Sequence, residues 1–190
     1  MKARPRPAPT GVQGLVDWYR IVLETIELRS FSNLWFWIAL AVMWSSASHW
    51  VLGVPFDMVM RARRQGGQAE LDLEDMVRIN VNRLLYISEV SGVWVIGIGC
   101  MILSALLVSG FVYGAEISQA LFLLGCPMAL VLLLSVRTAA RIRGFGLTGP
   151  ELWRKLGTHR FVIQLIGMMS IFVTALWGMF HNMSFTALGG

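Results

Sequence analysis

The sequence predicts an all-α, polytopic membrane protein: a single helical bundle of four transmembrane helices, preceded by an amphipathic helix. Its residues are 56% hydrophobic and only 14% charged, which is too apolar for the surface of a soluble domain. Crossing the hydrocarbon region of a bilayer takes about 20 apolar residues. Four windows have that length, namely residues 34–54, 90–113, 117–136 and 161–183, and all 16 Lys and Arg residues lie outside them.

The segment before the first window divides into two parts. Residues 1–14 are basic and contain Pro5, Pro7 and Pro9, which favours a disordered, extended tail. Residues 15–29 are typical of an amphipathic helix, because apolar side chains recur at helical spacing: Leu15, Trp18, Tyr19, Val22 and Ile26. Such a helix lies either in the headgroup region of a membrane or against the protein's own loops, and both alternatives remain open.

The first window is framed by aromatic residues. Trp35 and Trp37 lie at one end and Trp50 at the other, as expected when amphipathic rings settle at both membrane interfaces. Pro55 follows the window and cannot continue the hydrogen bonding of an ideal helix. We therefore expect the helix to end, kink or restart there, and the chain to return to water at Arg61.

The second and third windows are predicted to form an antiparallel helical hairpin. Residues 70–89 mix charged and apolar side chains and are expected to form a helix that starts in the cytosol and runs into the second span. A short turn at residues 114–116 then leads into the third span. Close approach of the two helices is expected at glycines, as is usual in lipid: Gly92, Gly97 and Gly99 in one helix and Gly125 in the other.

The last span is expected to continue a helix that starts outside the membrane. Thr148 and Glu151 have the spacing of a capping box, and Pro150 lies between them. The predicted helix runs through Lys155 and Arg160 into residues 161–183, and residues 184–190 form a short C-terminal tail. No internal repeat is visible, which argues against a transporter with duplicated halves.

The distribution of Lys and Arg predicts the orientation. The two loops at residues 61–83 and 137–160 hold 11 of the 16 basic residues, so four full spans place both loops in the cytoplasm and both termini outside. The alternative is a re-entrant helical hairpin at residues 31–60, which would make all basic residues cytoplasmic and put the polar run at residues 45–49 near its tip. Four spans is the preferred topology, because residues 34–54 make a good single span.

Candidate chemistry is sparse. Nothing resembles a phosphate loop, a zinc spacing or a nucleophile paired with its base, so the sequence predicts a protein that is not an enzyme and holds no cofactor or metal. Cys100 and Cys126 lie inside predicted spans and are expected to act as small apolar residues. His49 and His181 are candidate haem ligands, but in the preferred topology they lie towards opposite membrane faces.

Glu89 is the most interesting ionisable residue, because it lies at the head of the second span. A carboxylate near the hydrocarbon boundary is costly unless it is protonated, paired or hydrated. Glu89 is therefore a candidate group for proton or cation handling, and the alternative is a carboxylate at the level of the headgroups. Arg83 lies six residues earlier on a different helical face and is not an obvious partner.

The basic loops are the predicted interaction surfaces. Each Lys or Arg close to an anionic leaflet contributes about 1 kcal/mol of membrane attraction, and the simpler interpretation is that these residues only orient the chain. The alternating charges of residues 70–83 also suit docking of a protein partner, whereas nothing favours nucleic acid. The residues predicted to face lipid or a partner are Arg61, Arg63, Arg64, Arg78, Arg83, Arg137, Arg141 and Arg143.

Two runs carry a resemblance to a known family. They are FSNLWFWIALAVMWSSASHWVLGVPFDMVMRARRQGG, at residues 31–67, and DLEDMVRINVNRLLYI, at residues 72–87. The chain resembles, over roughly residues 17–143, short multi-span alphaproteobacterial proteins described as a component of the SufBCD complex. The resemblance implies a multi-pass protein of the bacterial inner (cytoplasmic) membrane, associated with iron–sulfur cluster assembly. It carries over no catalytic or binding residues.

Two functional hypotheses follow. The first is a non-catalytic inner-membrane accessory protein that presents a charged cytoplasmic surface to a partner, with the SUF complex as the partner implied by the resemblance. The second is a small transport or proton-handling subunit that uses Glu89 and the serine-rich first window. A partner lost on reversal of Arg78 and Arg83 favours the first hypothesis, and ion flux lost in Glu89→Gln favours the second.

Overall fold

The computed structural model describes residues 34–188, so the predicted N-terminal tail and amphipathic helix lie outside the described residues. Residues 34–188 are helical apart from one pair of two-residue antiparallel strands and the short turns between the helices. The elements, in chain order, are α2 (Leu34–His49), β1 (Trp50–Val51), β2 (Val54–Pro55), α3 (Phe56–Gln65), α4 (Gln68–Leu107), the π-helix η2 (Val108–Val112), α5 (Glu116–Phe145) and α6 (Gly149–Leu188).

Three helices among the described residues are long and apolar enough to cross a membrane: Gln68–Val112, Glu116–Phe145 and Gly149–His181. They cover the second, third and fourth predicted spans to within two residues and extend beyond them on the side of the basic loops. Helix α2 is shorter, at 16 residues, or about 24 Å, against a hydrocarbon thickness of about 30 Å. The described chain therefore has three long spanning candidates where the sequence predicted four.

The first predicted span differs because its last residues are not helical. Helix α2 ends at His49, and the chain turns back on itself through β1 and β2. Leu52 and Gly53 have positive φ angles of 53° and 75°, and Pro55 holds extended backbone before α3 begins. The prediction that the helix is interrupted near Pro55 is confirmed, but the interruption starts five residues earlier.

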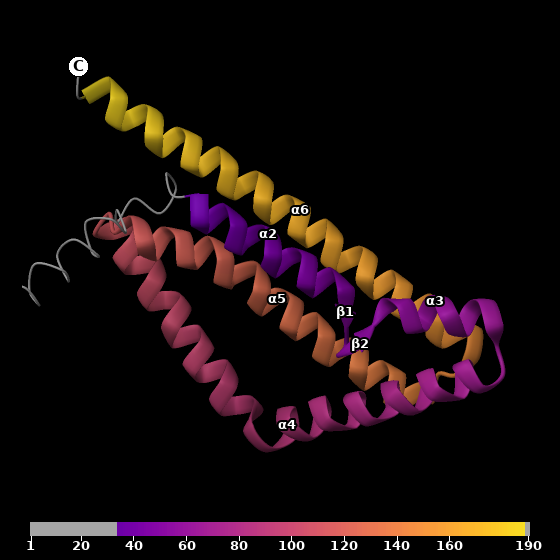
Figure 1. Cartoon of the computed structure of the whole chain (residues 1–190). Coiled ribbons are helices and arrows are strands. Elements are labelled where there is room, and N and C mark those ends of the chain that lie inside the picture. Colours follow the sequence, from indigo (N-terminus) through magenta and orange to yellow (C-terminus); the bar gives the residue numbers. More distant parts are fainter. Residues whose placement is uncertain (1–33, 189–190) are drawn as a thin grey trace, which may run out of the picture.

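The long helices run side by side for part of their length (Figure 1). Helices α2 and α6 lie antiparallel, with α5 beside them, and α4 bends near its middle before it meets the start of α5. Ser88, Ser91 and Gly92 lie close to the centre of α4, and such residues are common at helix bends. The hairpin of α4 and α5 around Gly114 is confirmed.

Two separate cores hold the helices together. The larger core joins the β1–β2 turn, α3, the first half of α4, the end of α5 and the start of α6. We call residues 50–89 and 137–160 the charged end. The smaller core consists of Leu40 and Trp44 of α2, Val131 of α5 and Ile163 of α6, with partly buried neighbours around them. We call residues 34–49, 90–136 and 161–183 the apolar part.

Helix α6 begins within a residue of the predicted start, but a distant residue satisfies its first amide. The N–H of Gly149 donates to Glu74 Oε1 of α4 at 2.8 Å. Carboxylates are favourable at this position because the first amides of a helix have no partners within the helix and carry partial positive charge. The cap therefore also joins α4 to α6.

The predicted glycine contacts are only partly correct. A Cβ at Gly97 or Gly99 would meet nothing within 4 Å, and one at Gly125 would make an ordinary contact with Leu103. The close approach is at Gly110, where a Cβ would lie 2.8 Å from the backbone nitrogen of Gln119. The bend in α4 explains the difference, since the two helices converge at their shared turn (Figure 1).

Candidate functional site

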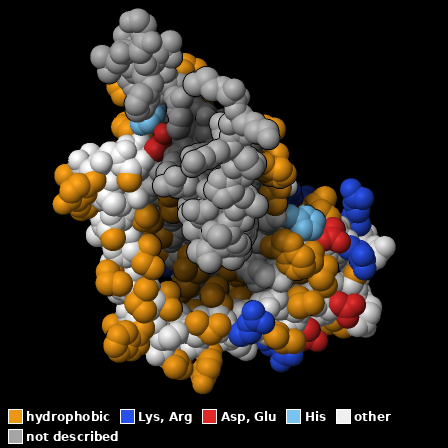
Figure 2. Space-filling model, turned by 60° about the vertical axis from the view of Figure 1, so that its left-hand side comes forward, with side chains coloured by type: hydrophobic (Ala, Val, Ile, Leu, Met, Phe, Trp, Pro, Cys, Tyr) orange, Lys and Arg blue, Asp and Glu red, His pale blue; other side chains and the backbone are white. Residues whose placement is uncertain are grey.

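The structure brings the two basic loops to the same end of the molecule. Side chains from both loops form one buried core, which includes Val77 and Val81 of α4, Ile142 of α5 and Leu156 of α6. Figure 2 shows Lys and Arg gathered towards one end of the visible face, while hydrophobic side chains cover much of the remainder. A single surface therefore collects charges that lie more than fifty residues apart in the sequence.

Helix α3 contributes three of the predicted arginines to this surface. Val59 and Ala62 are buried against α4, while Arg61, Arg63 and Arg64 are exposed. The pattern is that of an amphipathic helix whose apolar side packs inward and whose charged side faces out. Arg137 and Arg141, near the end of α5, are also exposed.

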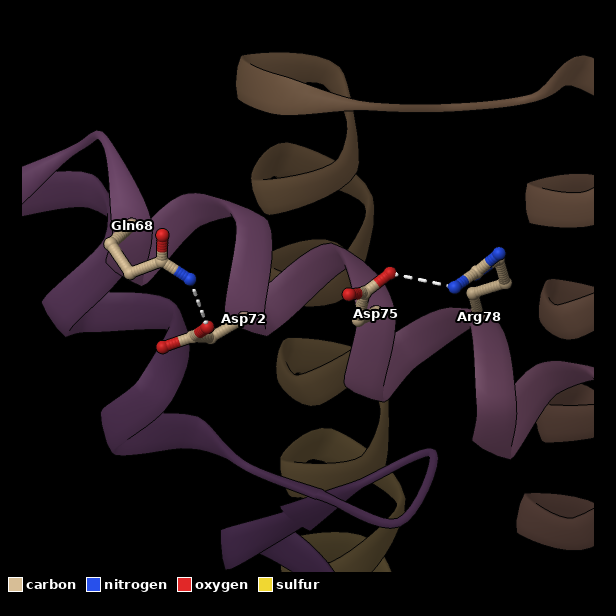
Figure 3. Close-up of polar contacts among 4 residues, drawn as sticks. All are labelled: Gln68, Asp72, Asp75 and Arg78. Atoms are coloured by element: carbon tan, nitrogen blue, oxygen red, sulfur yellow. Dashed lines mark hydrogen bonds and ion pairs between the residues drawn. The ribbon is translucent and has the colours of Figure 1, made fainter.

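A row of paired polar side chains runs along the first half of α4 (Figure 3). Gln68 donates to Asp72 at 2.8 Å, and Arg78 pairs with Asp75 at 2.8 Å. Pairs three or four residues apart on an exposed helix add only about 0.2–0.5 kcal/mol each. Arg83, further along the helix, is exposed and has no ion-pair partner within residues 34–188. Arg83 is therefore more available to a partner than Arg78.

Glu89 has a partner that the sequence reasoning missed. Its carboxylate accepts a hydrogen bond from the guanidinium of Arg143 at 2.5 Å, and the Glu89 side chain is 61% exposed. Arg143 lies 54 positions later, at the end of α5, so helical spacing gave no signal for the pair. The pair links α4 and α5 at the surface. Arg143, which we predicted to face lipid or a partner, is therefore already paired within the chain.

The histidines considered as haem ligands lie far apart. Trp44 packs against Gly167, which sets the register of α2 along the antiparallel α6. His181 lies fourteen residues beyond Gly167, or about 21 Å at about 1.5 Å per residue, while His49 lies in the opposite direction. One macrocycle cannot take both imidazoles as ligands.

The described part of the chain holds no cluster of side chains suited to a metal ion. Within residues 34–188, no three His, Cys, Asp or Glu side chains are placed to hold a metal ion. Cys100 and Cys126 are unpaired and exposed in the apolar part. His181 instead lies near Glu116, with its Nδ1 3.9 Å from the carboxylate.

The sequence reasoning also missed His159. This residue is buried between α5 and α6, where its two ring nitrogens lie 3.1 Å from the Ser135 hydroxyl and 3.3 Å from the Thr138 hydroxyl. The available signal was the spacing of Ser135 and Thr138, which places both hydroxyls on one side of α5. The three residues form a polar joint where the apolar part meets the charged end.

A second polar joint lies at the opposite end of the apolar part. Gln119 is buried, and its amide donates to the Gly110 carbonyl at 2.8 Å and accepts from the Trp177 indole at 3.0 Å. The Trp177 ring also contacts Phe111 and Phe180. Gln119 thereby joins η2, α5 and α6 near the turn.

No family model, curated protein or solved structure matches this chain. The fold and the surface therefore define the class: a helical protein with three helices able to span a membrane by length and apolarity, and with one compact charged end.

Proposed function

We propose that the chain is a non-catalytic, integral inner-membrane accessory protein whose charged end docks a partner in the cytoplasm. The observation that carries the proposal is the common core of the two basic loops, which joins residues 50–89 and 137–160 into one surface. A packed surface favours docking because less conformational freedom is lost when a partner binds.

We further propose that α2 crosses the membrane as a short fourth span. Helix α2 starts away from the charged end and runs beside α6 towards β1 (Figure 1). Helix α3 then packs on α4 and α6, so it does not return along α2 as a re-entrant hairpin would require. The Lys and Arg of the charged end place that end in the cytoplasm.

The partner is proposed to bind through charge. Arg61, Arg64, Arg83 and Arg137 are exposed and have no ion pair within the described residues. Guanidinium groups bind carboxylates through paired, directional hydrogen bonds, so an acidic protein surface is the expected complement. The resemblance of residues 31–67 and 72–87 to SufBCD-associated proteins is what supports the SUF iron–sulfur assembly machinery as that partner.

The test is affinity purification of the full chain from native membranes in mild detergent. The variant Arg64→Glu/Arg83→Glu should lose a stoichiometric cytosolic protein, while Arg64→Lys/Arg83→Lys, which retains the charge, should keep most of it. Arg64 and Arg83 are both exposed, so neither variant should change the unfolding temperature. A partner retained by the glutamate variant would contradict docking through this surface.

A further inference from the structure

A groove lies between α3 and the first turns of α6, within the charged end. It has a volume of about 450 Å³, in the usual range for small-molecule sites. Its walls combine apolar and basic side chains: Phe56, Val59, Met60 and Arg63 from α3, and Trp153 and Arg154 from α6. Asp57 and Glu151, the acidic residues nearest in sequence, are not among the residues that line it.

Two hydrogen-bond donors beside this groove have no partner within the described part of the chain. They are the indole N–H of Trp153, which lines the groove, and the Nε–H of Arg160, whose guanidinium carbon lies 4.0 Å from the centre of the Phe56 ring. A buried donor without an acceptor is costly. An acceptor brought by a ligand would remove that cost.

The groove also lies at the boundary of the apolar part. Phe56 and Thr158 line the side of the groove nearest to residues 161–183 of the apolar part. Pro150 lines the opposite side. A ligand with an anionic head and apolar chains can reach the basic and aromatic side chains from the membrane. A water-soluble anion would leave the apolar wall uncovered.

We propose that this groove binds one anionic phospholipid, with its phosphate between Arg63 and Arg154 and its glycerol and first acyl carbons against Phe56 and Met60. The inference uses the cytoplasmic-membrane orientation proposed above but does not depend on any protein partner. The groove would hold one lipid at a defined site, whereas the exposed arginines outside it would attract lipid headgroups without a defined site.

The experiment is native mass spectrometry of the purified, delipidated full chain in an uncharged detergent. Phosphatidylglycerol, phosphatidylcholine or inorganic phosphate is added at equal concentration. We expect one phosphatidylglycerol to be retained in preference to phosphatidylcholine. Replacing Arg63 or Arg154 by Gln should weaken this binding by about fivefold each, the equivalent of about 1 kcal/mol for one basic residue near anionic headgroups.

Two matched pairs of variants separate the groove from general charge. Gly157 lines the groove and has open space at its Cβ, so Gly157→Leu should fill it and abolish the retained lipid, while Gly144→Leu should not. Arg61→Gln, on the same helix as Arg63 but outside the groove, should leave binding unchanged. If Gly157→Leu fails to fold, the arginine variants still decide the matter.

Equal retention of phosphatidylcholine, equal binding of inorganic phosphate, or equal losses in Arg61→Gln and Arg63→Gln would each overturn the proposal. Because no partner protein is present in this measurement, a failed pulldown with intact lipid binding would count against the proposed docking function alone. Intact partner capture without selective lipid binding would count against the groove alone.

Discussion

The charged end and the apolar part are built on opposite principles. In the charged end, α3, α4, α5 and α6 bury Leu73, Val77, Leu152 and Leu156 and expose arginines and carboxylates, as a small water-soluble domain does. In the apolar part most of the large hydrophobic side chains lie outside the small core around Trp44 and face outward, and Val93 is 86% exposed. The hydrophobic effect can therefore hold the charged end together, whereas the apolar helices gain nothing from it towards one another in lipid.

The apolar part is instead joined at a few specific contacts. Trp44 of α2 packs on Gly167 of α6, Gly110 allows the backbone of α5 to approach, and Gln119 hydrogen-bonds across to Trp177. Small residues and interhelical hydrogen bonds are the usual means of packing within a bilayer. Substitutions of equal size should therefore have unequal effects in the two regions.

The largest effect is expected in the core of the charged end. Leu73 is fully buried, so Leu73→Ala should lower the free energy of unfolding by about 2–5 kcal/mol. Thermal unfolding in detergent measures it. Leu132→Ala removes the same three carbon atoms from an exposed site of the apolar part and should change the melting temperature little. Equal shifts for the two variants would remove the distinction between the regions.

A smaller loss is expected at the close contact of the apolar part. Gly110→Ala would put a Cβ 2.8 Å from the Gln119 backbone nitrogen, so η2 and α5 must separate, at a cost of about 1–3 kcal/mol. Gly97→Ala is the control, because its Cβ would meet open space and alanine favours a helix. A stable Gly110→Ala protein with an unchanged melting temperature would show that the approach of the helices is not needed.

The hydrogen bond between Gln119 and Trp177 should contribute less. A double-mutant cycle with Gln119→Leu and Trp177→Phe isolates their coupling, which we expect at about 0.6 kcal/mol, a typical value for such bonds in membrane proteins. Unfolding in a mixed detergent–denaturant series provides the measurement. Additive effects of the two substitutions would mean that the bond adds nothing to stability.

The smallest effect is expected at the surface pair of Glu89 and Arg143. Both side chains are about half exposed or more, so Glu89→Gln should cost only a few tenths of a kcal/mol in stability. The same substitution bears on function, because reconstituted vesicles should show the same ion and proton permeability with either side chain. A flux that disappears in Glu89→Gln would favour the transport hypothesis over the accessory one.

The sequence alone predicted the parts of this fold that depend on local pattern. Long apolar windows and the glycine turn at residue 114 led to the three long helices, and the Thr148–Glu151 spacing led to the start of α6. The turn after His49 was placed too late, because the sequence prediction took Pro55 as the end of the helix, whereas the chain already turns at Leu52 and Gly53, both with positive φ.

The contacts between distant segments were beyond such reasoning. Positive charge predicted that both basic loops lie on one side, but not that they share a core or that Arg143 reaches Glu89. The groove between α3 and α6 was equally hidden, since it exists only once residues 56–63 pack against residues 150–158. Apolar windows along the sequence predict long helices, whereas a surface depends on how those helices pack.

The cap on α6 has a consequence for how the chain is assembled. The acceptor for the Gly149 amide is the side chain of Glu74, a residue that is synthesised 75 positions earlier. The first turn of α6 therefore gains its capping hydrogen bond only when α6 packs against α4. An α6 fragment produced without the preceding sequence should fray at its N-terminus. Adding the preceding segment with Glu74 as a separate polypeptide should restore the helical first turn.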